Sequence, residues 1–575
     1  MTRPPTTSSS HQTPLPTAVP GQVSPDRWRI LPVLLLGLFM VLLDTSIVTN
    51  GLATLQRDLH ASSAQVQFVL TSYTVAYGVL LIIGGRLGDL FGRRRLFLLG
   101  LAGFTLTSAL CGLAWSPLSL IVFRVIQGAT AALLFPQVTS FIQVLFPPAE
   151  RPRAFGLQGA MIGLGIVAGP LLGGLLIDAD LFGSLWRPIF LVNVPVGVAA
   201  LLWASRLLPE SKSETARGLD VPGVALLSVA LGLLIYPVVE GREQGWPGWI
   251  LGLLALSLVL LVVFVLYQRR LLTQGRDPLV QLSMFSDRSF AVGAAIAFVF
   301  QSSVLSYFVV MSLFFQAGLG YGPTQAALLL IAYQVSIAVA SLLSARLGAR
   351  LGRNVLTLGT ALLMAGLIGT LIILNASALH YQGYELIPAL IVSGFGFGCV
   401  AAPLQSVILS RVNPAFAGSA SGVLATVQQV GSALGVAVIG ILLFGQLGAR
   451  VDSVGAEVRP GLERSLQAAR LPSSAVSAIG TGFTRCVHDR FNQVDLNTVP
   501  ASCTPFALPA AVARPVNAAL VSAGTEVRHQ TFLDAVLYTL RFQLAAYAVC
   551  FLLVFLLPGA PAATPRPTAI PAARP

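Results

Sequence analysis

The sequence predicts an all-α integral membrane protein with fourteen membrane-spanning helices. Hydrophobic residues make up 55% of the 575 residues and charged residues only 10%, whereas about 25% of the residues in a soluble domain are charged. The mean hydropathy is +0.80. The apolar residues form runs of the length that crosses a bilayer, about 20 residues, and the arginines stand between these runs.

The formal net charge of +13 reports topology rather than nucleic-acid binding, because the arginines do not gather among aromatic residues. The chain has no GxxxxGK[ST] sequence, so it lacks a phosphate-binding loop of the Walker type. Uphill transport then requires an ion gradient or a separate ATPase subunit. The sequence contains no CxxC motif of the kind that binds metals. We expect no cofactor, no nucleic-acid partner and no enzymatic activity.

The apolar runs follow one another along the chain after a tail rich in Pro, Ser and Thr. The first run is too long for the core of a signal peptide, so we interpret it as a retained span. The expected spans are 30–50, 66–84, 96–115, 118–142, 154–177, 187–207, 221–240, 249–268, 290–315, 324–345, 355–375, 385–410, 417–445 and 537–557.

Basic residues orient these spans. With a cytoplasmic N-terminus, the tails and inner loops hold most of the 35 basic residues, whereas the short outer loops hold only Arg57, Arg187 and Arg242. Short loops rich in arginine stay on the cytoplasmic side. We therefore expect a multi-pass protein of the bacterial cytoplasmic (inner) membrane with both termini in the cytoplasm.

The spans group into two bundles with an insertion between them. A weak repeat supports this division, because the sequence from Arg86 to Arg93 resembles that from Arg346 to Arg353, with Ala349 in place of Asp89. The expected units are a disordered cytoplasmic tail (1–29), a first six-helix bundle (30–208), two inserted helices (221–271), a second bundle (289–445, completed by 537–558), an extracytoplasmic loop (446–536) and a cytoplasmic tail (559–575).

The loop 446–536 is rich in Ala, Pro and Arg, and we expect a small cap or a partly ordered loop with short helical patches. It contains Cys486 and Cys503, whereas the other three cysteines fall within apolar spans. In an oxidising compartment these two residues can form a disulfide, which would gain about 3 kcal/mol by restricting the unfolded chain. Two unpaired thiols are the alternative.

A short polar segment, Gly84–Arg95, separates the second and third spans. Four arginines and one aspartate cannot lie in hydrocarbon, so we expect a solvent-side hairpin. Its glycines at 85, 88 and 92 allow a tight turn with close backbone approach. Asp89 can pair with a neighbouring arginine or receive a helix N-terminus. A basic loop that only fixes topology is the simpler interpretation.

Two ionisable residues lie well inside spans: Asp44 in the first and Arg124 in the fourth. Each is about six residues from the outer end of its span, or about 9 Å of helix, so the two groups are at similar depth. A carboxylate beside a cation in a cavity that alternately hydrates and dries can carry a proton. Gln127 is one turn from Arg124. A static ion pair that fixes helix packing is the alternative.

The fifth span is rich in small residues. Gly165, Gly169 and Gly173 form a stripe on one helix face that permits close contact with another helix, and Pro170 removes one backbone donor and can bend the span. In the ninth and tenth spans Gln301, Tyr307, Tyr333 and Gln334 are candidates to line a substrate cavity, although lipid-facing or packing positions are equally ordinary.

Several of these motifs resemble the major facilitator superfamily and its fourteen-span drug:proton antiporters. The segment containing Gly85, Gly88, Asp89, Gly92, Arg93 and Arg94 is similar to the superfamily's loop between spans 2 and 3. Leu43–Val48 resembles the span-1 motif of the antiporters, and Arg124, Gln127 and Gly128 resemble the span-4 motif tied to proton coupling. The spacing of Gly156, Gly165, Gly169, Pro170, Gly173 and Gly174 matches the antiporter signature, which is associated with export.

Further matches are Trp186–Gly197, which resembles the start of span 6, and Ala417–Gly422 with Gln429–Gly431, which resemble span 13. The resemblance implies the major facilitator fold and multidrug-type efflux, in which the protein exports lipophilic or cationic small molecules in exchange for protons by alternating access. The substrate, protons and the lipid bilayer are then its partners, and a periplasmic or outer-membrane partner stays undetermined.

Other interpretations are an exporter of one endogenous metabolite or lipid with the same fold, and a non-transporting membrane sensor or scaffold. A membrane-embedded enzyme would rest on the isolated spacing of His529 and Asp534, which resembles an acyltransferase motif.

Overall fold

The computed structural model describes residues 25–180, 183–214, 218–241, 244–376, 382–492, 499–503 and 510–558. Most of the two predicted tails lies outside these residues. The regular structure described is helical, and fourteen helices are long and apolar enough to cross a membrane. The predicted fold class is therefore confirmed.

The first bundle contains six of these spans. Two of its helices begin at serine capping boxes, at Ser62 with Gln65 and at Ser116 with Ser119, so a side chain accepts a hydrogen bond from a free amide of the first turn. The helices are α1 (Arg27–Asp58), α2 (Ser63–Phe91), α3 (Arg93–Gly112), α4 (Pro117–Leu145), α5 (Arg151–Asp178), and the consecutive α6 (Pro188–Leu191) and α7 (Asn193–Leu207). Within the bundle, α4 packs against α2 and α3, and α1 packs against α5.

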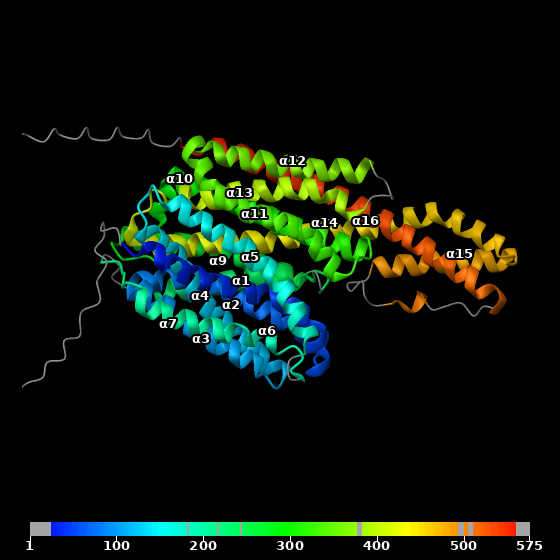
Figure 1. Ribbon diagram of the computed structural model, residues 1–575, viewed down its shortest axis with the longest axis horizontal. Coiled ribbons are helices and arrows are strands. Elements are labelled where there is room, and N and C mark those ends of the chain that lie inside the picture. The colour runs from blue at the N-terminus through cyan, green and yellow to red at the C-terminus, as the bar shows by residue number, and fades with distance from the viewer. Residues whose placement is uncertain are drawn as a thin grey trace, which may run out of the picture.

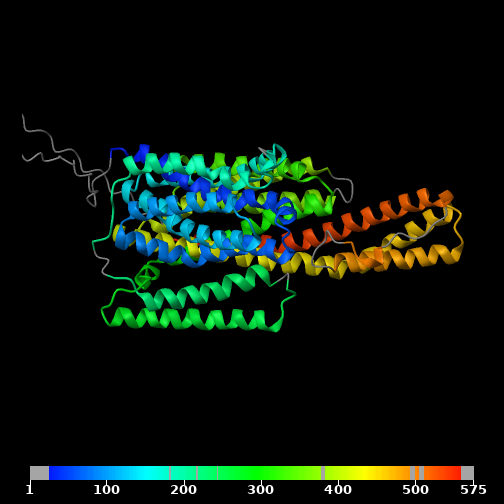
Figure 2. The same ribbon diagram turned by 90° about the horizontal axis from the view of Figure 1, so that it is seen from below.

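Two inserted helices, α8 (Val221–Glu240) and α9 (Gly248–Thr273), form a pair beside the bundles (Figure 2). Asp220 caps α8 by accepting a hydrogen bond from the amide of Gly223 at 2.9 Å. The pair packs mainly against α2, and α8 also reaches α14.

The second bundle also has six spans. They are α10 (Arg288–Leu313), α11 (Pro323–Leu351), α12 (Asn354–Ala376), α13 (Ile387–Leu409), α14 (Ala417–Ala468) and α16 (Ala510–Phe555). Short turns flank them, namely η2 (Leu282–Ser286), the π-helical η3 (Phe314–Gly318), η4 (Gly383–Leu386) and η5 (Pro414–Phe416). We call the end of the bundles with the α2–α3 turn at Gly92 the basic face, and the opposite end the far face.

The far face carries a long helical extension between the last two spans, where a small cap or a partly ordered loop with short helical patches was expected (Figure 1). α14 has 52 residues and α16 has 46. At 1.5 Å per residue these helices are about 78 and 69 Å long, far more than the hydrocarbon thickness of about 30 Å. Both therefore continue beyond the predicted spans, and α15 (Ser473–Phe491) packs against the extension of α14.

The extension is helical because apolar residues recur there every three or four positions. On α14 the buried residues include Val451, Val454, Val458, Leu462 and Leu466, a single face of a helix. On α15 they are Val476, Ile479, Phe483, Val487 and Phe491, among others. The Ala- and Pro-rich composition suggested a loop, but this periodicity decides the structure. Cys486 at the end of α15 forms a disulfide with Cys503 of η6 (Ala501–Cys503).

The two bundles approach each other most closely in the half of the molecule near the basic face. A side chain at Gly422 on α14 would meet the Leu81 carbonyl oxygen of α2 at 2.8 Å. Likewise, a side chain at Gly156 on α5 would meet the Ser341 carbonyl oxygen of α11 at 2.6 Å. These helix pairs, α2 with α14 and α5 with α11, form the main contacts between the bundles. The structure is therefore closed on the basic face.

Candidate functional site: a buried aspartate–arginine pair in the first bundle

Asp44 on α1 and Arg124 on α4, predicted to lie at similar depth, form an ion pair inside the first bundle. Oδ2 of Asp44 is 2.5 Å from Nη1 of Arg124, and the two side chains are 0% and 1% exposed. Removing two charges from water costs several kcal/mol per ion, and their attraction offsets this only when further hydrogen bonds satisfy the remaining atoms. The surroundings of the pair must therefore supply such bonds.

Two side-chain amides donate further hydrogen bonds to Asp44. The side-chain nitrogen of Gln127 donates to Oδ1 of Asp44 at 2.9 Å, and that of Asn193 donates to the same oxygen at 3.2 Å. Gln127 also accepts from Arg124 Nη1 at 2.8 Å and donates to the Ser108 hydroxyl at 2.8 Å. Gln127, which the sequence placed one turn from Arg124, thus contacts both members of the pair.

The guanidinium of Arg124 is held by α2 as well. Its Nε donates to the Val69 carbonyl oxygen at 3.3 Å. Its Cζ lies 4.1 Å from the centroid of the Tyr73 ring and 5.7 Å from that of Phe190. An aromatic face attracts a desolvated cation by about 2 kcal/mol. Arg124 therefore keeps partners on α2 even if Asp44 is neutralised.

Sequence reasoning assigned no coupling role to Asn193, Ser108 or Tyr73. Asn193 interrupts an apolar run at the start of α7, and a lone amide in such a run is the signal that would have found it. Ser108 and Tyr73 carry no comparable signal, because serine and tyrosine are common in membrane helices. Only packing brings Asn193 and Tyr73 to the pair and Ser108 to Gln127.

The segment 84–95 is more helical and more buried than the expected solvent-side hairpin. α2 continues to Phe91 and α3 starts at Arg93, so the turn consists of Gly92, whose φ is 104°. Arg86, Asp89 and Arg93 are at most 2% exposed. Burial of these charges is possible because each finds a partner within the protein, in particular across the bundle interface.

The carboxylate of Asp89 lies against the N-terminus of α14. Its two carboxylate oxygens accept from the amides of Gly418 at 2.9 Å and Ser419 at 2.8 Å. Arg93 donates to the same carboxylate at 2.8 Å and to the Pro414 carbonyl oxygen at 3.0 Å. A carboxylate at a helix N-terminus interacts favourably with the helix dipole. The contact joins the first bundle to the second at the basic face.

The other predicted residues of this segment have distinct surroundings. A side chain at Gly85 would overlap the Gly418 carbonyl oxygen, and one at Gly88 would overlap the amide of Gln137 on α4. These two glycines therefore permit α2 to approach α14 and α4. Arg94 lies outside the cluster and donates to the Ser205 carbonyl oxygen of α7 at 2.7 Å.

The glycines of α5 serve two different contacts. Gly165 and Gly169 pack against Leu42 and Ser46 of α1, within the first bundle, whereas Gly156 packs against α11 of the second. The predicted stripe is thus an internal contact, and the contact with the second bundle at Gly156 lies about two and a half turns nearer the basic face. Gly173 is buried, a side chain at Gly174 would meet nothing within 4 Å, and Pro170 lies inside the continuous helix.

The four candidate cavity residues do not form one group. Tyr307 and Tyr333 are 2% exposed, with ring centroids 5.7 Å apart, inside the second bundle. Gln334 is 4% exposed, and its backbone faces Gly163 of α5. Gln301 is half-buried on α10. A direct role in binding a substrate therefore stays a prediction for each.

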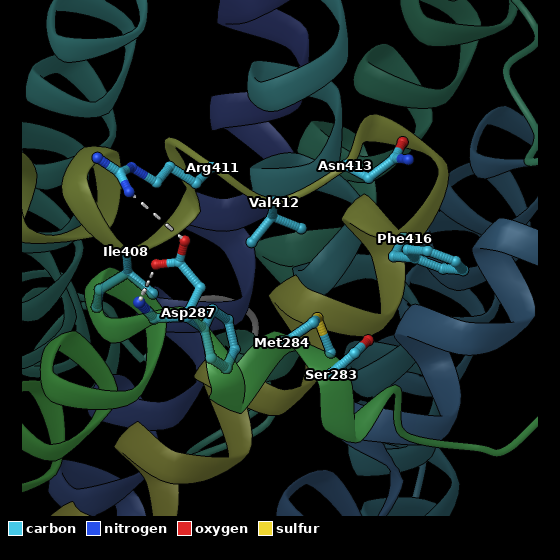
Figure 3. A pocket seen from close by; sticks show the side chains of 9 residues that line it. Ser283, Met284, Asp287, Ile408, Arg411, Val412, Asn413 and Phe416 are labelled. Atoms are coloured by element: carbon cyan, nitrogen blue, oxygen red, sulfur yellow. Dashed lines mark hydrogen bonds and ion pairs between the residues drawn. The ribbon is translucent and has the colours of Figure 1, made fainter. Parts of the chain in front are cut away.

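A cavity of about 170 Å³ (Figure 3) lies at the basic face of the second bundle, and its lining residues do not include Asp44. Its wall includes Asp287, which caps α10, and Arg411, whose Nη1 is 4.0 Å from the Asp287 carboxylate. A second cavity, of about 680 Å³, lies between residues 218–222 and the end of α9. Neither cavity contacts the aspartate–arginine pair.

Comparisons with known proteins agree with this architecture. Residues 34–436 match the family model of the Major Facilitator Superfamily. The chain is 38% identical to a probable actinorhodin transporter of Streptomyces coelicolor over 540 residues, which are 93% of this chain and 92% of that protein. It is 33% identical to the tetracenomycin C resistance and export protein of Streptomyces glaucescens, over 73% of this chain and 77% of that protein.

Two further comparisons extend this result. The multidrug resistance protein Stp of Mycobacterium tuberculosis is 33% identical over 75% of this chain and 77% of that protein. Among solved structures, the proton:xylose symporter XylE superposes with a TM-score of 0.52 at 18% identity, over 71% of this chain and 87% of that chain. The structural likeness shows the fold alone. The chain therefore belongs to the major facilitator superfamily, as its motifs predicted, and is a membrane transporter.

Proposed function

We propose that this protein exports lipophilic or cationic small molecules in exchange for protons, by alternating access of a site between the two bundles. The named relatives are antibiotic exporters and resistance proteins, which supports drug efflux as the function. The observation that carries the proton coupling is the buried Asp44–Arg124 pair with its amide partners.

In this proposal Asp44 is the proton carrier. A proton that binds Asp44 neutralises the carboxylate and removes its attraction for Arg124, which remains held by Val69 and Tyr73 of α2. Protonation thus loosens α1 from α4, because Arg124 bridges these helices and α2. When the proton leaves, the ion pair forms again and restores the contact.

The contact of Asp89 with the α14 N-terminus would hold the basic face closed. The distribution of arginines supports a cytoplasmic location for this face, and in the proposed cycle the closed basic face then shuts the cytoplasmic side. Export then requires that Asp89 and Arg93 release α14 in each cycle, which admits substrate from the cytoplasm. Gly85 and Gly88 support this contact by allowing α2 to approach α14 and α4.

The direct test compares two aspartates of α1. In inverted membrane vesicles energised by a proton gradient, Asp44→Asn should abolish transport of a lipophilic fluorescent cation such as ethidium, at least 100-fold below wild type, while the protein still inserts. Asp58→Asn is the matched control, because Asp58 lies outside the cluster and pairs with Arg187. Unchanged transport by Asp44→Asn would remove Asp44 from the mechanism.

A narrower function, export of one endogenous metabolite, is the second candidate. One observation favours it: the relative named for actinorhodin matches 93% of this chain, whereas the one named for tetracenomycin C matches 73%. If vesicles transport none of a panel of lipophilic compounds, intracellular accumulation of a single metabolite in a deletion strain would identify this function.

A further inference from the structure

Gln143, close to the end of α4, is a buried side chain whose hydrogen bonds cross to the second bundle. Its side-chain nitrogen donates to the carbonyl oxygens of Leu409 at 3.0 Å and Val412 at 3.3 Å, and the residue is 0% exposed. Carbonyl oxygens only accept hydrogen bonds, so the nitrogen of the amide must face them. The contact therefore requires a donor at this position.

Leu409 is the last residue of α13, so Gln143 lies against the C-terminus of that helix. The last carbonyl groups of a helix have no partner within it and carry a partial negative charge. Asp89 of the same bundle meets the opposite polarity, because it accepts from the amides at the N-terminus of α14. The first bundle thus contacts both ends of residues 409–419, which we call the α13–α14 turn.

Other groups of the first bundle hold the middle of the α13–α14 turn. Arg93 donates to the Pro414 carbonyl oxygen at 3.0 Å. The hydroxyl of Ser140 on α4 is buried and donates to the Ala417 carbonyl oxygen at 3.3 Å. Ser140 lies almost one turn before Gln143 on the same face of α4. This face of α4 is therefore directed at the turn.

The second bundle itself holds the α13–α14 turn less tightly. Nη1 of Arg411 is 4.0 Å from the carboxylate of Asp287, longer than a charge-assisted hydrogen bond. A cavity of about 170 Å³ lies between the turn and the start of α10, with Val412, Asn413 and Phe416 in its wall (Figure 3). The position of the turn therefore depends on its contacts with the first bundle.

α4 also carries Arg124 of the buried ion pair. It is one continuous helix, with Pro136 inside it, and at 1.5 Å per residue about 28 Å separate Arg124 from Gln143. A change at Arg124 that moves α4 also moves the Gln143 amide, whereas Asp89 and Arg93 belong to α2 and α3. α4 thus reaches the second bundle by a route that does not include the charged contact.

We infer that Gln143 is a positioning residue for alternating access, one that aligns the α13–α14 turn with α4 each time the basic face closes. The inference rests on the proposed export function and deepens it. Gln143 acts as an uncharged hydrogen-bond donor, so its contribution is independent of the charge on Asp89. It stabilises the closed state, because its two acceptors belong to the bundle that moves away when the basic face opens.

Spin-label distances in the purified full-length protein in nanodiscs test this role. With the three free cysteines replaced, labels at Arg206 and Arg350 report the basic face. Labels at Leu113 and Tyr384 report the far face, and all four residues are exposed. Gln143→Met removes the donor and keeps the length of the side chain. The ratio of open to closed basic face should rise about fivefold, the effect of one net hydrogen bond, and the far-face distance should shorten in the same fraction of molecules.

The opposite changes at the two faces separate positioning from stability. Gln158→Met is the matched control, because Gln158 is 1% exposed and donates to the Thr139 hydroxyl at 3.2 Å, inside the first bundle. It removes a similar buried hydrogen bond and should leave both distance ratios within about twofold of wild type. Equal opening by both variants, or longer distances at both faces in Gln143→Met, would show that the amide only supports packing and overturn the inference.

The double variant Asp89→Asn with Gln143→Met tests independence. Because the two residues hold opposite ends of the turn, the double variant should open the basic face about fivefold further than Asp89→Asn alone. No further opening would show that Gln143 acts only through Asp89, which contradicts the inference.

These measurements use neither a substrate nor a proton gradient, so this inference and the export function fail separately. Unchanged distances in Gln143→Met would overturn the inference while proton-driven transport that depends on Asp44 stands. The expected shift in a protein that transports no lipophilic cation would support the inference and remove the proposed export of such cations.

Discussion

The interiors of the two bundles are built alike but differ in charge. In the first, Asp44, Arg124 and Asn193 come from α1, α4 and α7. In the second, the phenol of Tyr307 on α10 lies 3.2 Å from the Thr370 hydroxyl on α12, and Gln543 on α16 donates to the Ser303 carbonyl oxygen. All these side chains are buried, but none of the buried side chains described in the second bundle is charged.

The difference indicates that the two bundles have different roles in the proposed coupling to protons. A neutral hydrogen-bonded cluster fixes helix packing without responding to a proton, whereas a buried carboxylate changes its interactions when it is protonated. On the proposed mechanism, the first bundle senses the proton and the second follows through the contact of α14 with Asp89.

Removing Arg124 should have the largest effect on stability. Arg124→Met leaves Asp44 buried without its cation, and such a loss costs about 3–5 kcal/mol. The double variant Asp44→Asn with Arg124→Met should recover part of this loss, because no uncompensated charge remains. Thermal unfolding of the purified variants in detergent measures both changes as a double-mutant cycle. Simple addition of the two single effects would contradict the coupling.

Asp89→Asn should shift the conformational equilibrium. Loss of the charge at the α14 N-terminus removes about 1–2 kcal/mol of favourable interaction, so the state open at the basic face becomes roughly 5–30 times more populated. A cysteine introduced at buried Ser421, with the three free cysteines replaced, should then react faster with a maleimide.

Arg94→Gln, which removes a charge from the same segment outside the cluster, is the control for Asp89→Asn. If both variants react equally fast, charge in general, rather than the contact of Asp89, controls the closure of the basic face.

Tyr307→Phe should have a modest effect. It removes the hydrogen bond to Thr370 in the second bundle, which contributes about 1 kcal/mol. The melting temperature should fall slightly, while export keeps its dependence on the proton gradient. If this variant abolished proton-driven export as completely as Asp44→Asn, both bundles would take part in the coupling. The assignment of the proton response to the first bundle alone would then be wrong.

Asp58, the half-buried last residue of α1, should show a smaller effect than Asp44 in the middle of the same helix. Partial burial raises its pKa, but hydrogen bonds from Trp186 at 2.9 Å and Arg187 at 2.8 Å outweigh this and hold the pKa below its usual value. An acid with a lowered pKa stabilises the fold above its unfolded pKa of about 4, and this stabilisation disappears as the pH falls through the lowered pKa.

Asp58→Asn should therefore reduce the melting temperature slightly at pH 7 and leave it unchanged in strong acid. Melting curves of wild type and variant between pH 3 and 7 measure this difference. A constant difference across the range would show that the effect does not come from ionisation of Asp58.

Much of the fold could be predicted because a bilayer restricts the options. Apolar runs of sufficient length become helices, since every backbone polar group in hydrocarbon needs a partner within its own segment. The predicted spans coincide with fourteen apolar helices. The helical extension could not be recognised from composition, although the spacing of Val451, Val454 and Val458 contained the signal.

The site could be predicted in part. Asp44 and Arg124 were identified because ionisable residues inside spans are rare and costly, and counting residues to the outer ends of their spans placed them at one depth. Glu240 stands at the end of its apolar run, where a carboxylate can reach water, yet the structure buries it against Thr71. Depth along a helix does not reveal which neighbour covers a given face.

Length, hydropathy and spacing are local properties of the chain, and from them the membrane-spanning helices, a division into two bundles, the export motifs and the two charges of the proposed proton site could be predicted. Which helix faces meet became visible only in the folded protein. Packing brings Asn193 and Tyr73 to the Asp44–Arg124 pair and Ser108 to its partner Gln127, turns the Gly165 stripe toward α1, and sets Asp89 against α14. These contacts join residues far apart in the chain, and their partners are fixed by packing around each helix rather than by any pattern along it.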